Sequence, residues 1–267
     1  MSLPTLLVIL NSISIAIVVA LILFKKNLFE SSKNNPQASK KNTMHLMVHE
    51  LRSPLTAIKD AASILISGKS GFNKQQQKQF LRIIYKQSKL LLDQISAIID
   101  AEKLEEGKLT VTKIPGDIAA FVNQQTKMFL LSAKKKNISL KVETLESLPT
   151  ISFDPIRIGQ VLNNLISNSL KFTKEAGEVS VKVTRKDPTE NYVTVSVSDT
   201  GIGISPEFQK KLFSKFAQSA PVSKEITKQG SGLGLYMVKG IIDAHGGSIN
   251  VESEPGKGTT ISFSLPI

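Results

Sequence analysis

A histidine stands at position 49, followed at once by a glutamate and, about one helical turn later, by Pro54. An imidazole can act as a nucleophile near neutral pH, and an adjacent carboxylate can accept the proton that the ring releases. In the helical periodicity of this segment, His49 falls on the face opposite the apolar seam. An incidental surface histidine is the alternative, and it suits His45 better. We therefore predict that His49 is an exposed acceptor for an incoming nucleotide and that Glu50 assists it.

A second group of residues, in the C-terminal half, has the types that bind a nucleotide. Asp199 ends a β-patterned run, and its carboxylate can accept a hydrogen bond from the amine of adenine, while Gly201 and Gly203 allow close approach of the backbone. A structural aspartate is the plainer interpretation of this turn. The later glycine run GSGLGL could be an ordinary loop, and it is no Walker P-loop because the lysine and hydroxyl residue that should follow are missing. In the run GSGLGL, three glycines open a helix whose free N–H groups would face phosphates: Gly230, Gly232 and Gly234.

Asn164, Asn168 and Lys171 are spaced by four and three residues, so they share one face of a helix. A polar stripe on an otherwise apolar helix is usually its solvated side. Amide oxygens together with a lysine also suit a magnesium–nucleotide site, which is the second interpretation.

The elements that must position these residues fall into two groups. Between residues 43 and 106, apolar side chains recur at about every 3.5 residues in two runs, which predicts two amphipathic helices joined by a glycine-containing loop. Such a slim hairpin cannot bury both stripes alone, so we expect a homodimer with a four-helix bundle. From residue 108 onward, clustered β-patterned runs mixed with helical stretches predict a separate α+β domain with helices on one face of a mixed sheet.

The opening residues predict a membrane anchor. The run from Leu3 to Phe24 contains no charged residue and would span roughly 30 Å as a helix. Lys25 and Lys26 follow directly, which places the rest of the chain in the cytoplasm by the positive-inside rule. A cleaved signal peptide is the competing interpretation, but a basic region before the run and a clear cleavage site after it are missing. We assign residues 1–26 to a single-pass anchor in the cell membrane and residues 27–42 to a polar linker.

Composition excludes several classes of function. The 267-residue chain has no cysteine, which removes disulfides, thiolate metal sites and cysteine nucleophiles. Its net charge of +12 suggests binding to nucleic acid, but the sequence has no lysine-rich run that is interleaved with aromatic residues. We expect no direct nucleic-acid partner, and a basic face that lies near anionic lipid or attracts nucleotide phosphates.

Five segments together resemble the sensor histidine kinases of two-component signal transduction. HELRSPLTAI, beginning at His49, resembles the phosphoacceptor box of that family, and the four other segments resemble its nucleotide-binding boxes in the family's order. The resemblance covers the chain from about residue 42 to its end. The four nucleotide-binding segments are QVLNNLISNSLKFT, DTGIG, FSKF and GSGLGL.

The resemblance implies a dimerisation and phosphoacceptor domain at residues 43–106 and an α/β-sandwich ATP-binding domain of the Bergerat type at residues 108–267. It implies that ATP phosphorylates His49 and that the phosphoryl group passes to an aspartate of a response regulator. It assigns Mg²⁺ to Asn168, with Asn164 and Lys171 near the phosphates. It also makes the segment 207–229, with Lys215, a lid over ATP.

The residue four positions after the histidine helps to dephosphorylate the regulator in this family. Here that residue is Ser53, where threonine or asparagine is more usual. A second departure is Ser169, where alanine is common, and we expect it to affect packing only.

Two other classes remain as alternatives: an ATPase or serine kinase with the same nucleotide fold, and a silent membrane scaffold that only dimerises. The first does not require His49 on a dimer-forming helix. The second does not require Asp199, Asn168 and the GSGLGL run together.

Overall fold

The structure, a computed structural model, describes residues 37–67, 71–144, 148–185, 189, 191–218 and 232–267. The predicted anchor (1–26) and most of the predicted linker lie outside the described residues. In the part of the chain that is described, no helix is both long and apolar enough to cross a membrane. The chain divides into two compact units, residues 1–48 and 49–267.

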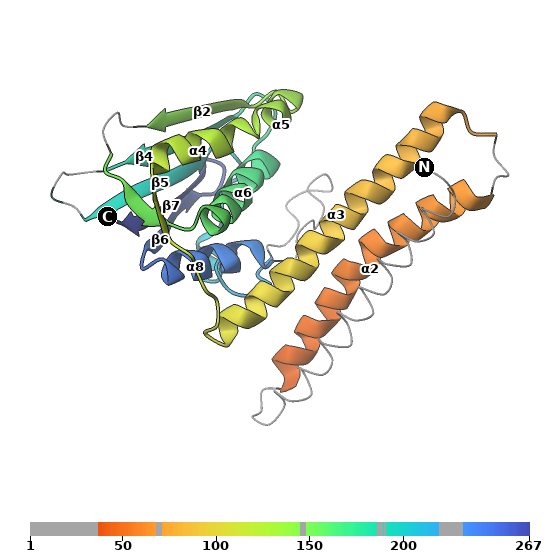
Figure 1. Cartoon of the computed structure of the whole chain (residues 1–267), viewed down its shortest axis with the longest axis horizontal. Helices are drawn as coiled ribbons and strands as arrows, with labels where there is room; N and C mark the ends of the chain where they lie inside the picture. Colours follow the sequence, from red (N-terminus) through yellow and green to blue (C-terminus); the bar gives the residue numbers. More distant parts are fainter. Residues whose placement is uncertain (1–36, 68–70, 145–147, 186–188, 190, 219–231) are drawn as a thin grey trace. The chain divides into compact units, whose positions relative to one another are not determined.

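Two long helices follow one another at the start of the described chain: α2 (Gln37–Ser67) and α3 (Lys74–Glu105). They run antiparallel, as the predicted hairpin requires (Figure 1). Helix α2 begins earlier than the predicted domain start at residue 43. Asn73 caps α3 in a reciprocal pair with Gln76: the Gln76 N–H donates to the Asn73 side chain at 2.9 Å, and the Asn73 N–H donates to the Gln76 side chain at 3.0 Å.

The hairpin leaves much of its apolar surface exposed in the single chain. Ile58, Leu91 and Ile98 are buried, but large apolar side chains on both helices remain accessible. So many exposed large apolar side chains on a monomer indicate an unfilled contact surface. The exposed side chains are Val48, Leu55, Ile64, Ile66, Leu81, Ile83, Tyr85, Leu90, Leu92 and Ile99.

The C-terminal domain is built on a five-stranded sheet in the order β2-β4-β5-β7-β6. β2 pairs with β4 in parallel, and the other neighbours are antiparallel, which confirms the predicted mixed sheet. Two short strands, β1 (Ile114–Gly116) and β3 (Ile151–Phe153), form a separate antiparallel pair. The five strands of the main sheet are β2 (Ser139–Thr144), β4 (Glu178–Thr184), β5 (Tyr192–Asp199), β6 (Ser248–Glu254) and β7 (Gly258–Pro266).

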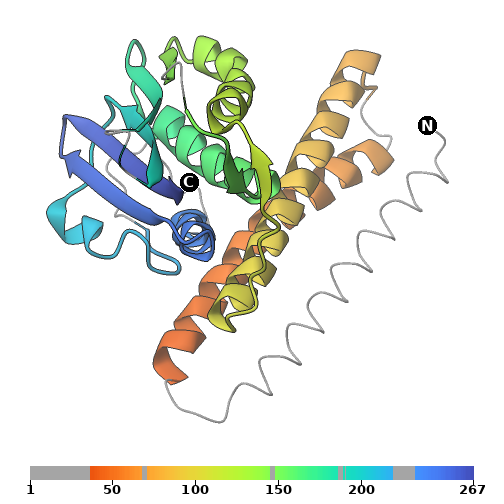
Figure 2. The ribbon, with the colours of Figure 1, turned by 60° about the vertical axis from the view of Figure 1, so that its left-hand side comes forward.

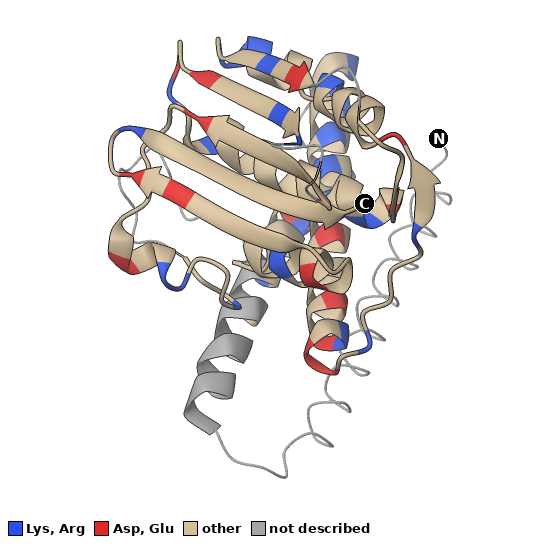
Figure 3. Cartoon of the chain, turned by 90° about the vertical axis from the view of Figure 1, so that its left-hand side faces the viewer, with Lys and Arg blue, Asp and Glu red and all other residues tan. Residues whose placement is uncertain are grey.

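Helices cover one face of this sheet (Figure 2). On β5 the side chains alternate, so that Val193, Val195 and Val197 are buried. Serine and threonine occupy the alternate positions on the other face, and Figure 3 looks onto that face. The predicted α+β class is therefore confirmed. The helices of this domain are α4 (Ile118–Lys127), α5 (Leu130–Lys135), α6 (Pro155–Phe172), α7 (Pro206–Gln209) and α8 (Gly234–Ala244).

A buried histidine ties α8 to the start of α6. His245 is 1% exposed, and its Nδ1 lies 2.8 Å from the carbonyl oxygen of Ile241. The backbone N–H of Asp154 donates to Nε2 at 3.0 Å, so Nε2 must be unprotonated and the imidazole neutral. Burial lowers the pKa of His245, and the nearby Lys113 ammonium lowers it further, while the hydrogen bond with Ile241 and the charge of Asp154 oppose them.

This histidine predicts a loss of stability in mild acid. The pKa of His245 is lower in the folded protein than the ordinary value of 6.5, so the unfolded chain takes up the proton first. The stabilisation is present above pH 6.5 and declines as the pH falls below that value. We expect urea unfolding at pH 7.5 and 5.5 to show a smaller free energy of unfolding at pH 5.5. His245→Gln should reduce this pH dependence, and an unchanged dependence in the variant would remove His245 as its cause.

Candidate functional site

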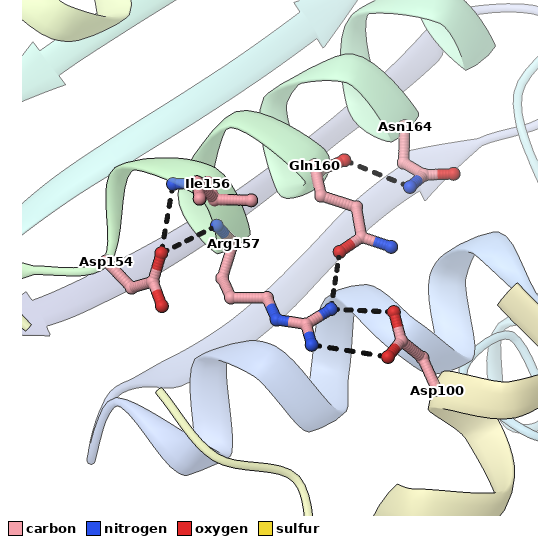
Figure 4. Close-up of polar contacts among 6 residues, drawn as sticks. All are labelled: Asp100, Asp154, Ile156, Arg157, Gln160 and Asn164. Atoms are coloured by element: carbon pink, nitrogen blue, oxygen red, sulfur yellow. Dashed lines mark hydrogen bonds and ion pairs between the residues drawn. The ribbon is translucent and has the colours of Figure 1, made fainter. Parts of the chain in front are cut away.

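The first turns of α6 are fixed by a chain of polar contacts (Figure 4). The carboxylate of Asp154 caps the helix by accepting from the N–H groups of Ile156 and Arg157, at 2.9 and 3.1 Å. The Arg157 guanidinium donates to both carboxylate oxygens of Asp100 on α3, at 2.6 and 3.2 Å, and also to Gln160. Both charged side chains are largely buried. Sequence reasoning missed this pair, because its partners lie 57 positions apart and no local pattern joins them.

Asn164 comes next on α6, and its amide is oriented by the same chain of contacts. Its Nδ2 donates to the carbonyl oxygen of Gln160 at 3.0 Å. Its Oδ1 faces Gly234, the first residue of α8, where an added Cβ would lie only 2.5 Å from that oxygen. Any larger residue at this position would displace the Asn164 amide from its present orientation. The structure thus brings a predicted asparagine against a predicted glycine.

The start of α8 suits an anion. The helix cap residue is Leu233, whose apolar side chain cannot accept a hydrogen bond from the first N–H groups. Gly232 has φ +66°, and its carbonyl oxygen accepts from the N–H of Phe216 at 3.0 Å. This places the second glycine segment against the FSKF segment. Gly230 lies outside the described residues.

Asn168 and Lys171 also lie on α6, as their spacing predicted, and both are half-buried. The Nζ atom of Lys171 lies 4.9 Å from the centroid of the Phe172 ring, a cation–π distance. The polar face of α6 is therefore not simply its solvated side.

Asp199 closes β5, and its carboxylate accepts hydrogen bonds from neighbouring elements. The N–H of Gly201 donates to Oδ1 at 2.9 Å, and the hydroxyl of Ser169 on α6 donates to Oδ2 at 3.0 Å. Burial raises the pKa of Asp199, and these two hydrogen bonds, together with one from the backbone of Thr259 on β7, oppose that effect. The turn then packs against the end of α6, where the N–H of Ile202 donates to the carbonyl oxygen of Phe172 at 3.4 Å. Gly203, with φ +68°, continues the same turn.

Lys215, the predicted lid residue, forms ion pairs with α3. Its Nζ donates to Glu105 at 2.8 Å and to Glu102 at 3.2 Å, both on α3. Burial alone would lower the pKa of Lys215, but the two carboxylates raise it above its ordinary value. In this arrangement the ammonium links its segment to the C-terminal end of α3. Residues 219–229 of the predicted lid lie outside the described residues.

The predicted acceptor His49 and its neighbour Glu50 lie on α2, although their side chains are outside what the structure describes. Ser53 lies about one turn farther along the helix and is exposed. Helix α2 continues through Pro54.

Comparisons with known proteins agree with this geometry. Residues 39–107 match the family of His Kinase A (phospho-acceptor) domains, and residues 153–267 match the family of histidine kinase-, DNA gyrase B- and HSP90-like ATPases. The non-motile and phage-resistance protein of Caulobacter vibrioides is 37% identical over 224 residues, which are 83% of this chain and 26% of that protein.

Two solved structures share the fold. Full-length ShkA in complex with AMPPNP superposes with a TM-score of 0.62 at 28% identity, over 85% of this chain and 45% of that chain. The catalytic domain of the histidine kinase ThkA superposes with a TM-score of 0.50 at 30% identity, over 59% of this chain and 96% of that chain.

The fold and the site therefore define a helical phosphoacceptor domain followed by an ATPase-like nucleotide domain. The chain belongs to the histidine kinase family, which confirms the resemblance seen in its motifs. It spans 26%, 20% and 30% of the lengths of the first three curated relatives.

Proposed function

We propose that this chain is an ATP-dependent protein histidine kinase that phosphorylates itself on His49. The observation that carries the proposal is the convergence of Asn164 on Gly234, because it joins the polar face of α6 to the glycine-rich start of α8. The N–H groups at a helix N-terminus suit a phosphate group, and an amide oxygen beside them suits its counter-ion.

Two groups of described residues support binding of ATP, one at each of its ends. Asp199 accepts a hydrogen bond from the adenine amine, and Gly201 and Gly203 keep the turn close to the base. The phosphates lie toward Gly232 and Gly234, where α8 begins. Mg²⁺, when bound, supplies charge neutralisation at the phosphates, and the oxygen of Asn168 is the group that would hold it.

The reaction transfers the terminal phosphoryl group of ATP to nitrogen. Neutral His49 attacks the γ-phosphorus with one ring nitrogen, the bond to the bridging oxygen breaks, and ADP leaves. Glu50 accepts or stabilises the proton on the other ring nitrogen. Asn164 and Lys171 act near the phosphates. Lys215 would add positive charge to this site, in competition with its ion pairs with Glu102 and Glu105.

Three partners complete the proposal: a second copy of the chain, a response regulator and the cell membrane. The exposed apolar stripe of α2 and α3 supports a homodimer with a four-helix bundle. The phosphoryl group then passes from His49 to an aspartate of a response-regulator receiver domain. The uncharged run before Lys25 supports a single-pass anchor in the cell membrane, with the kinase domains in the cytoplasm.

The chemical stability of the product tests the reaction. The chain is incubated with ATP that is radiolabelled on the γ-phosphate, and the labelled protein is then treated with mild acid or with alkali. Phosphohistidine loses its label in acid, whereas phosphoserine keeps it. Acid-stable label would favour a serine kinase, and a chain that takes up no label would favour the scaffold.

A second activity, dephosphorylation of the regulator, is favoured by the exposure of Ser53 about one turn from His49. Its hydroxyl can orient water, but it lacks the methyl group that restricts threonine. We expect Ser53→Ala to prolong the lifetime of the phosphorylated regulator and Ser53→Thr to shorten it. Autophosphorylation should stay within a few-fold of normal. The measurement is the decay of purified phospho-regulator with each variant, and identical decay rates would exclude Ser53 from dephosphorylation.

A further inference from the structure

Ser169 does more than fill space in α6. Its side chain is 6% exposed, and its hydroxyl donates to Oδ2 of Asp199 at 3.0 Å across 30 positions of sequence. The expectation that this serine affects packing only is therefore incomplete. A buried hydroxyl that donates to a carboxylate forms a charge-assisted hydrogen bond, which is stronger than a neutral one.

Another buried hydroxyl shows the contrast. Thr126 on α4 is fully buried, and its hydroxyl donates to the carbonyl oxygen of Val122, one turn earlier in its own helix. That bond satisfies a polar group locally and orients nothing else. Ser169 instead reaches from α6 to the end of β5, where it contacts a side chain of the candidate site.

The carboxylate of Asp199 is held at both oxygens, by Gly201 at Oδ1 and by Ser169 at Oδ2. A carboxylate has about four lone-pair positions, so it can still accept from another donor. These two donors, with the backbone N–H of Thr259 on β7, leave its plane little freedom to rotate. An incoming amine then meets an acceptor whose direction is already set, and this reduces the entropy lost on binding.

We propose that Ser169 is a positioning residue that orients the Asp199 carboxylate toward the 6-amino group of adenine. The proposal rests on the proposed function, because it takes Asp199 to be the group that recognises the base. The electrostatics agree: burial raises the pKa of Asp199, whereas the Ser169 hydroxyl lowers it and so favours the ionised acceptor. Serine at this position thus supports both the direction and the charge of the carboxylate.

The test compares two ligands that differ only at the amine. ADP carries the 6-amino group, and purine riboside 5′-diphosphate carries hydrogen there. Both are titrated by calorimetry against the unaltered chain, Ser169→Ala and the matched control Thr126→Val. If the alanine variant does not fold, Ser169→Cys replaces it, because a thiol has a similar size and is a weaker donor.

We expect Ser169→Ala to weaken ADP about three- to tenfold and to leave the analogue within about twofold, since a net hydrogen bond contributes about that much. Thr126→Val should change the two affinities by equal factors. Equal weakening of ADP and the analogue by Ser169→Ala, or no weakening of either, would overturn the proposal. Asp199→Asn separates the role of Asp199 from the positioning role of Ser169. If Asp199→Asn leaves the ADP affinity unchanged, Asp199 does not recognise the base. If Asp199→Asn weakens ADP binding but Ser169→Ala does not, only the positioning role is refuted.

Discussion

Replacement of His49 by glutamine is expected to abolish autophosphorylation while ATP affinity stays nearly unchanged. The glutamine amide nitrogen is not nucleophilic, so the phosphoryl group has no acceptor. The nucleotide residues on α6, β5 and α8 belong to a different domain and keep their contacts. The measurements are labelling with radioactive ATP for the reaction and calorimetry for binding.

His45 provides the matched control, because it lies four positions earlier in the same helix. His45→Gln should label normally, which separates loss of the acceptor from loss of a histidine in α2. Acid-labile label that persists in His49→Gln would show that another residue accepts the phosphoryl group.

Asp199→Asn should weaken adenine nucleotide binding by roughly 10- to 100-fold, because a hydrogen bond to a charged group contributes about 1.5–3 kcal/mol. Asparagine has nearly the same shape, but it replaces an ionised oxygen with an amide. Its NH₂ group also faces one of the two donors, either Gly201 or Ser169, and cannot accept the hydrogen bond that the carboxylate oxygen accepted there. Calorimetry with ADP measures the effect.

Asp243→Asn is the control for this substitution. Asp243 lies on α8 in an exposed pair with Lys239, and exposed pairs contribute little. Its replacement should leave the ADP affinity unchanged. If Asp199→Asn binds ADP as the control does, Asp199 takes no part in recognising the base.

Local patterns were enough to predict the elements and the residues that share one of them. The periodicity of apolar side chains predicted α2, α3 and α6, and the spacing of Asn164, Asn168 and Lys171 placed them on one helix. The mixed sheet followed from clustered β-patterned runs. These features depend on residues a few positions apart, where helix and strand geometry fixes the relation.

Contacts between distant elements could not be predicted in this way. The pair of Ser169 with Asp199 and the pair of Lys215 with Glu102 each join segments whose meeting depends on the completed fold. The neutral state of His245 likewise depends on a backbone N–H from position 154. Sequence alone shows the residue types, but the partner that changes the role of each one is determined by tertiary packing.

The bidentate pair of Arg157 with Asp100 determines how the junction of α3 and α6 responds to the ionic strength of the solution. At 0.1 M salt, dissolved ions screen exposed charges beyond about 10 Å, but they act much less on buried pairs. The Lys141–Glu178 pair is exposed and will weaken as salt is added, whereas the side chains of Arg157 and Asp100 are only 20% and 14% exposed. Ionic strength should therefore leave this junction unchanged, and with it the position of Asn164, about two turns farther along α6.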